Sequence, residues 1–360
     1  MNGISGINHL QSQLNQYAFN PSSSSCTSGL SLLYTLLLLF TSVEETSPVY
    51  SNLCNVLDLN DVSLEAFKAL LSNLDDAGVH TAASSFVRDF SGLNPVIESI
   101  QRTYLNSKCQ PLTTAEAINQ WASEHTNGTI REIIPELTGD IEAVLISALY
   151  FKAKWLHEFD PAGTRPQTFT TLSGEEKEVS TMHMRKTHRR VWDSAVSSGF
   201  VNEYIGSANG VEALFSLPTE PGEPGLRAAL AELTTQTPEK DAKITGINIS
   251  LPRFKIETTT LADPFLKQLG LTELYNSFQY AAVASNPYVS VSSTVQKTFL
   301  AVDEEGTEAS AVTAMFIASG IFMDPKVDRD LEFDRPFVFA LVDKASGSRL
   351  LTAVVIDPSS

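Results

Sequence analysis

The chain has 360 residues, of which 42% are hydrophobic and 19% are charged, as in globular proteins that bury a large core. Its formal net charge of -17 opposes binding to nucleic acid or to an anionic membrane surface, so neither is expected as a partner. Three widely spaced cysteines, Cys26, Cys54 and Cys109, predict reduced thiols rather than a disulfide framework.

The N-terminal residues, MNGISGINHLQSQLNQ, lack a basic start followed by an apolar core, so no signal peptide is expected. The apolar run from Leu30 to Phe40 is too short to span a bilayer and favours a buried helix. We therefore expect a protein that is cytoplasmic or exported without a leader. No linker divides the sequence, which predicts a single domain over residues 1–360.

The first part of the chain contains mainly helical patterns. Helices are predicted over residues 4–17, 30–40, 48–57, 62–74 and 95–105, and a strand over 80–89. The run Asn20-Pro21-Ser22-Ser23-Ser24 offers N-cap candidates for the helix at 30–40. In the segment 115–134, one helical stripe ends at Asn127-Gly128; it consists of Ala117, Ile118, Trp121 and Ala122.

The later part contains mainly strand patterns. The continuously apolar run from Ala143 to Phe151 predicts a strand that is covered on both faces, and Trp155 follows it closely. Strands are also predicted within 167–218 and over 248–256, and short helices over 226–233 and 262–269.

The stretch from Val302 to Met323, VDEEGTEASAVTAMFIASGIFM, can form a strand but precedes loop-forming residues. Gly306 is expected to adopt backbone angles that other residues avoid. After Gly306 the stretch contains no proline, and its only charged residue is Glu308. With a period of two, Glu308 lies on one face. The other face is small, hydroxyl-bearing or apolar, and consists of Thr307, Ala309, Ala311, Thr313, Met315 and Ile317.

This stretch resembles the hinge and reactive loop of the serpins, a family of serine protease inhibitors. The hinge pattern of inhibitory members is matched by Glu304, Glu305, Gly306, Thr307, Glu308, Ala309, Ser310, Ala311, Val312 and Thr313. The strand before Trp155 also resembles a serpin segment, and the segments 333–342 and 350–358 resemble the C-terminal hairpin of the family. The resemblance implies an α+β serpin fold with three β-sheets, about eight to nine helices and an exposed reactive loop over about residues 307–325.

The resemblance also implies a suicide inhibitor. A serine protease, or alternatively a cysteine protease, forms an acyl bond with the loop, and the cleaved loop then inserts into the main sheet as a new strand. Counting from Glu304 places the scissile bond between Gly320 and Ile321, where small residues favour an elastase-like or subtilisin-like target. The loop is longer than usual, and a displaced bond would use Met323, Lys326 or Arg329 instead.

Two clusters are implied to control the opening of the sheet. Trp155, Arg253 and Glu304 are expected where the sheet first opens. A second cluster, which we call the shutter, is expected lower down, where the family usually has serine, asparagine and histidine. In this chain its members are expected to be Asn20, Ser23, Ser147 and Gln296.

No sequence motif predicts catalysis, since G-x-S-x-G, Walker, HExxH and CxxC patterns are all absent, so neither an enzyme nor a cofactor or metal is expected. Two histidines lie in a basic run that favours a solvated strand face over a metal or polyanion site; the run contains His183, Arg185, Lys186, His188, Arg189 and Arg190. The native protein is expected to be a monomer that can polymerise by loop insertion. The alternative function is a non-inhibitory serpin that acts as a binding or chaperone module.

Overall fold

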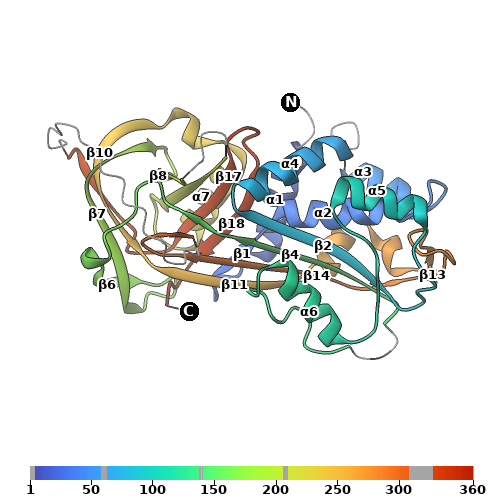
Figure 1. Ribbon diagram of the computed structural model, residues 1–360. Helices are drawn as coiled ribbons and strands as arrows, with labels where there is room; N and C mark the ends of the chain where they lie inside the picture. Colours follow the sequence, from blue (N-terminus) through green and yellow to red (C-terminus); the bar gives the residue numbers. More distant parts are fainter. Residues whose placement is uncertain are drawn as a thin grey trace.

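The computed structural model of the protein describes residues 5–57, 63–137, 139, 141–205, 210–307 and 327–359. Within these residues it contains eight α-helices and three β-sheets, in agreement with the predicted α+β class, three sheets and eight to nine helices. Helices α1 to α5 gather at one end of an elongated molecule, and strands β6, β7 and β10 form the other end (Figure 1).

At least four of the eight described helices begin at a side-chain cap. Ser28, Ser63, Asn94 and Thr114 each accept a backbone N–H bond at the start of a helix. The buried second helix is therefore capped by Ser28, not by a residue of the Asn20–Ser24 run. The helices are α1 Ser5–Ala18, α2 Gly29–Phe40, α3 Pro48–Leu57, α4 Leu64–Asp76, α5 Pro95–Leu105, α6 Ala115–His125, α7 Glu223–Thr235 and α8 Asp263–Gln268.

The main sheet has seven strands, in the order β3-β2-β4-β14-β15-β5, with β11 also paired to β14. Its two central strands, β4 and β14, are parallel, whereas β2 is antiparallel to β4. The strands are β2 Val79–Val87, β3 Gln110–Pro111, β4 Ala143–Phe151, β5 Ala153–Lys154, β11 Phe254–Leu261, β14 Val291–Val302 and β15 Gly306–Thr307.

Strand β4 is buried along its whole length, as its apolar sequence predicts. Its alternate residues Val144 and Ile146 pack in a cluster with α6 on one face of the sheet. Leu145 and Leu149 belong to the large core cluster that includes α2 on the other face. A strand between two apolar layers has no solvent face, which explains the continuous hydrophobic run.

A second sheet of nine strands has the order β1-β18-β17-β9-β8-β7-β10-β16, with β6 paired to β7. Strands β17 and β18 form the predicted C-terminal hairpin. The strands are β1 Ser25–Thr27, β6 Arg165–Thr170, β7 Glu176–Asp193, β8 Ser197–Glu203, β9 Val211–Pro218, β10 Lys243–Pro252, β16 Arg329–Glu332, β17 Phe337–Asp343 and β18 Arg349–Val355.

The predicted strand over 248–256 is divided between two sheets. The chain leaves the second sheet after Pro252 and enters the main sheet at Phe254, so Arg253 lies at the junction. The third sheet is the pair β12 Phe278–Gln279 and β13 Tyr288–Val289. Of the helices that the structure describes, none is long and apolar enough to cross a membrane.

Candidate functional site

The hinge begins inside the main sheet. Strand β15 is antiparallel both to β14, through Val302 and Thr307, and to β5, through Gly306 and Lys154. A tight turn precedes it, in which the Asp303 carboxylate accepts the N–H groups of Glu305 at 3.0 Å and of Gly306 at 3.1 Å. Gly306 and Thr307 of the predicted hinge therefore already form a strand between β14 and β5, the short strand that directly follows β4.

Thr307 points into the core at this position. It is completely buried, and its Oγ1 lies 2.9 Å from the hydroxyl oxygen of Tyr204. The Tyr204 ring stacks on Trp155, with 4.4 Å between the ring centroids. Burial raises the pKa of Tyr204 well above its ordinary value, so the hydroxyl keeps its proton and remains able to hydrogen-bond to Thr307. The inward orientation of Thr307 agrees with the period-two prediction.

Gly306 is required by space. A Cβ atom at this position would lie 2.1 Å from the carbonyl oxygen of Ala153 and 2.9 Å from the Cα of Lys154. Its φ is not in the left-handed region, so the unusual backbone angles expected from the sequence are not used. The glycine instead allows the hinge backbone to approach β5 closely.

The three residues predicted to control sheet opening lie together at the top of the sheet. Glu304 has a side chain that is only 5% exposed, and it accepts a bond from Arg253 Nε at 2.7 Å and another from the Thr164 hydroxyl. The Trp155 indole donates to the carbonyl oxygen of Asp303 at 2.9 Å. These contacts anchor the turn that leads into the hinge.

We expect Arg253→Ala to destabilise the protein more than Glu304→Ala does. Removing Arg253 leaves a buried carboxylate with the Thr164 hydroxyl as its remaining side-chain donor, which costs about 1–3 kcal/mol. Removing Glu304 leaves a guanidinium that is 46% exposed and can be hydrated, so the cost is about 0–1 kcal/mol. Urea unfolding measures the difference, and equal losses would contradict this account. Both variants should also polymerise faster on mild heating, as seen on native gels.

In the predicted shutter, the structure brings two of the four residues together. Ser147 and Gln296 face each other across β4 and β14. The Gln296 amide holds the backbone of Ser28 at the start of α2, accepting its N–H at 3.2 Å and donating to its carbonyl oxygen at 2.8 Å. An amide thus supplies one donor and one acceptor at the position where the family usually has a histidine.

Asn20 and Ser23 are exposed in a turn before β1, so the structure corrects these two assignments. Ser28 and Cys26 contact β14 in their place, and Cys26 Sγ lies 3.0 Å from the Thr298 hydroxyl. Burial raises the pKa of Cys26 to about 11, so its thiol stays neutral. Several consecutive serines are equivalent N-cap candidates by sequence, and the short strand β1 that intervenes carries no periodic signal of its own.

Part of the predicted site lies outside the described residues. This applies to hinge residues 308–313, to Gly320 and Ile321 at the predicted scissile bond, and to the alternatives Met323 and Lys326. The third alternative, Arg329, begins strand β16, which is parallel to β10 in the second sheet. Its guanidinium contacts Asp193 at 2.6 Å. A residue that is fixed by a strand and an ion pair cannot easily enter a protease cleft, so Arg329 is a poor candidate for the cleavage site.

The basic run on β7 is only partly solvated. Arg185, Lys186 and His188 are exposed, but His183 and Arg189 are buried, so the predicted solvated face is correct for part of the run. Burial lowers the pKa of Arg189 to about 10. Across the residues that the structure describes, no group of three or more histidine, cysteine, aspartate or glutamate side chains could hold a metal ion.

The fold and the hinge together define a class of protein. It is an α+β protein in which the first hinge residues, Gly306 and Thr307, already form a strand of the main sheet. The model of the family described as Serpin (serine protease inhibitor) matches residues 9–358, and the chain belongs to this family. Antichymotrypsin-2 of Bombyx mori is 28% identical over 297 residues, which cover 79% of this chain and 78% of the relative. A serine protease inhibitor of Cyanea capillata is 29% identical over 252 residues, which cover 68% of this chain and 65% of the relative.

Solved structures show the same fold. Serpin48 of Tenebrio molitor superposes with a TM-score of 0.79 at 23% identity, covering 97% of this chain and 95% of that chain. The native stressed conformation of Arabidopsis AtSerpin1 superposes with a TM-score of 0.80 at 22% identity, covering 100% of both chains.

Proposed function

We propose that this serpin is a suicide inhibitor of a protease, which it traps as an acyl complex by inserting its cleaved loop into the main sheet. The observation that supports this most directly is the position of Gly306 and Thr307 in strand β15. If the chain continues in the same direction, the next residues pass between β4 and β14. Ala309, Ala311 and Thr313 then follow Thr307 on the buried face.

Insertion would improve the pairing of the central strands. Strands β4 and β14 form a parallel ladder from Val291–Ala143 to Phe299–Tyr150. A strand that continues β15 would replace this one parallel ladder by two antiparallel ladders, which are somewhat more stable per residue. Burial of Met315 and Ile317 would contribute about 1.5–3 kcal/mol each. Glu308 would remain on the opposite face.

Insertion also requires movement of the segment that consists of α6 and the residues after it, which lies across β4 and β14. The segment of α6 and the residues after it contact both central strands: Asn127 donates to the Tyr150 hydroxyl of β4, and Lys297 of β14 donates to the Glu132 carbonyl oxygen. Val295 and Phe299 of β14 pack in the same cluster as Trp121 of α6. These contacts hold β4 and β14 together in the native state, so they oppose insertion before the loop is cut.

After the protease has formed the acyl bond, loop insertion competes with hydrolysis of that bond. A change of about 1.4 kcal/mol in either activation barrier changes the ratio of the two rates tenfold. An SDS-stable complex with at least one member of a serine and cysteine protease panel is the expected result. Loop cleavage without any such complex would favour the non-inhibitory alternative.

We expect cleavage between Gly320 and Ile321 by a protease with a small, apolar primary pocket, elastase-like or subtilisin-like, since Gly320 offers no side chain to a deep charged pocket. Mass spectrometry of the released C-terminal peptide identifies the bond. Gly320→Arg should redirect inhibition toward trypsin-like proteases, whereas Gly320→Ala should not. A peptide that begins at Val327 or Asp330 would contradict this assignment.

A further inference from the structure

Two arginines differ from all the others in the chain. Of the twelve arginines, all within the described residues, ten donate a hydrogen bond to a carbonyl, carboxylate or sulfur acceptor. Within the described residues, the side chains of Arg165 and Arg185 make neither a hydrogen bond nor an ion pair, and both residues are exposed. In a chain with a formal net charge of -17, two unpaired guanidinium groups are unexpected.

These two arginines lie on the neighbouring strands β6 and β7 at one end of the molecule, and the charges of both act on His183. Arg165 begins β6 and is paired with Thr181 of β7, so its side chain lies on the same face as those of Thr181 and His183. Arg185 follows at a bulge, where the register of β7 against β10 shifts and Lys186 has a φ of 50°. Bulges redirect side chains out of the regular alternation.

His183 is near enough to both guanidinium groups for their charges to act on its imidazole. Burial is the main cause that lowers its pKa, and the charges of Arg165 and Arg185 lower it further. The His183 Nδ1 is 3.0 Å from the Ser250 hydroxyl, while its Nε2 is buried without a partner. The imidazole is therefore neutral near pH 7, and the positive charges that act on it are those of the two arginines.

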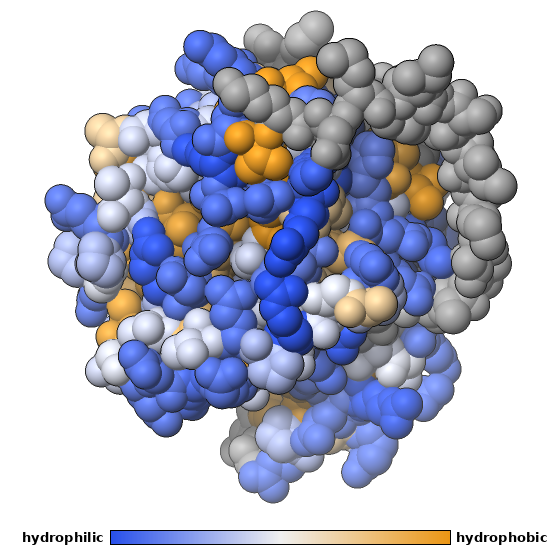
Figure 2. Space-filling model, turned by 90° about the vertical axis from the view of Figure 1, so that its left-hand side faces the viewer, coloured by the Kyte–Doolittle hydropathy of each residue, from blue (hydrophilic) through white to orange (hydrophobic). Residues whose placement is uncertain are grey.

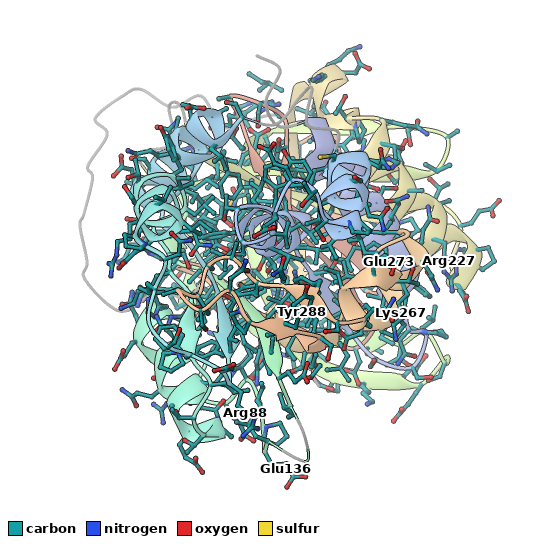
Figure 3. All side chains as sticks on the ribbon, turned by 90° about the vertical axis from the view of Figure 1, so that its right-hand side faces the viewer. Arg88, Glu136, Arg227, Lys267, Glu273 and Tyr288 are labelled. Carbon is teal, nitrogen blue, oxygen red and sulfur yellow. The ribbon has the colours of Figure 1, made fainter. Side chains whose placement is uncertain are left out.

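The opposite end of the molecule has a different charge arrangement. Figure 3 looks at that end and labels side chains of both signs there: Arg88, Glu136, Lys267 and Glu273. Arg88 donates to the carbonyl oxygen of Ile141, so its guanidinium already has an acceptor. Figure 2 looks at the β6–β7 end, where hydrophilic side chains cover most of the face. Among the described residues, unpaired guanidinium groups are thus specific to the β6–β7 end.

The β6–β7 face lies near β16, the strand that follows the predicted reactive loop. Strand β16, the first element after the loop, pairs with β10, and β10 pairs with β7, so β7 and β16 are separated by roughly 10 Å. The β16 side contributes acidic residues, with Asp330 accepting a bond from Asn248 at 2.6 Å and Glu332 opposite Ser250. The face therefore has a basic half on β6–β7 and an acidic half on β16.

We propose that Arg165 and Arg185 form a docking surface for an acidic segment on the target protease, next to the predicted reactive loop. The proposal rests on the proposed inhibitory function. A guanidinium that lacks an internal acceptor presents its fork of N–H donors to an external carboxylate, which it binds in a bidentate way. Two groups suit a short acidic segment of a protein better than a long polyanion, which the overall negative charge would repel.

The test compares the double variant Arg165→Glu/Arg185→Glu with a control, Lys68→Glu/Lys267→Glu, that changes the net charge equally. Lys68 and Lys267 are exposed and lie on α4 and α8. With the first panel protease that the wild type traps, we expect the association rate constant of the Arg165/Arg185 variant to fall about tenfold at low salt. Its salt dependence should flatten. The control should stay within about twofold, and the stoichiometry of inhibition should be unchanged in both.

A neutral double variant, Arg165→Gln/Arg185→Gln, controls for misfolding caused by charge reversal. Its association rate constant should also fall, but by less. Equal losses in the charge-reversal variant and its control, or no loss in either, would overturn the docking surface and leave the inhibitory function intact. Loss of heparin binding by the Arg165/Arg185 variants without a change in association rate would also overturn it, in favour of a polyanion. Absence of any trapped protease with the wild type would overturn both proposals.

Discussion

Replacement of Thr307 by arginine is expected to expel the hinge from the main sheet and to turn an inhibitor into a protease substrate. In the structure Thr307 is already fully buried against Tyr204. Burial of an unpaired guanidinium there costs several kcal/mol, so the substitution acts on the native state before any protease arrives.

The stoichiometry of inhibition measures this effect. We expect at least a tenfold rise in inhibitor molecules cleaved per protease trapped, since a change of about 1.4 kcal/mol in either activation barrier suffices. Because Trp155 stacks on Tyr204, its fluorescence should change in the uncleaved variant. Thr307→Ser keeps a hydroxyl for Tyr204 and should inhibit normally. An unchanged stoichiometry in Thr307→Arg would contradict the insertion mechanism.

Cleavage of the loop between Ala314 and Met323 is expected to raise the Tm sharply. Once cut, the hinge can extend β15 and complete the sheet, so the strain of the native state is released. A net gain of about 5 kcal/mol would raise the Tm by roughly 7 °C in a chain of this size. Thermal unfolding of the intact and nicked proteins provides the measurement.

The matched control for this experiment is nicked Thr307→Arg, which should show a much smaller rise because its hinge cannot enter the sheet at the first step. A rise of equal size in both nicked proteins would mean that it arises from something other than hinge insertion. Equal Tm values for the intact and nicked wild type would favour the non-inhibitory alternative.

The sequence by itself determined the features that depend on local periodicity. The continuous apolar run of β4 predicted a strand covered on both faces, and the structure places apolar clusters on each side of it. The period-two pattern after Gly306 placed Thr307 on the inward face, where it lies. Such features follow from the geometry of the strand and do not require knowledge of its neighbours.

Only the tertiary structure decided which distant residues meet. The role of Gly306 depends on the carbonyl oxygen of Ala153, and the shutter contains Ser28 instead of Asn20 because β1 intervenes before α2. The predicted strand around Arg253 belongs to two sheets, which brings its guanidinium to Glu304. Whether an arginine is neutralised depends on the acceptors that the fold places near it, so Arg165 and Arg185 cannot be distinguished by sequence from the paired ones.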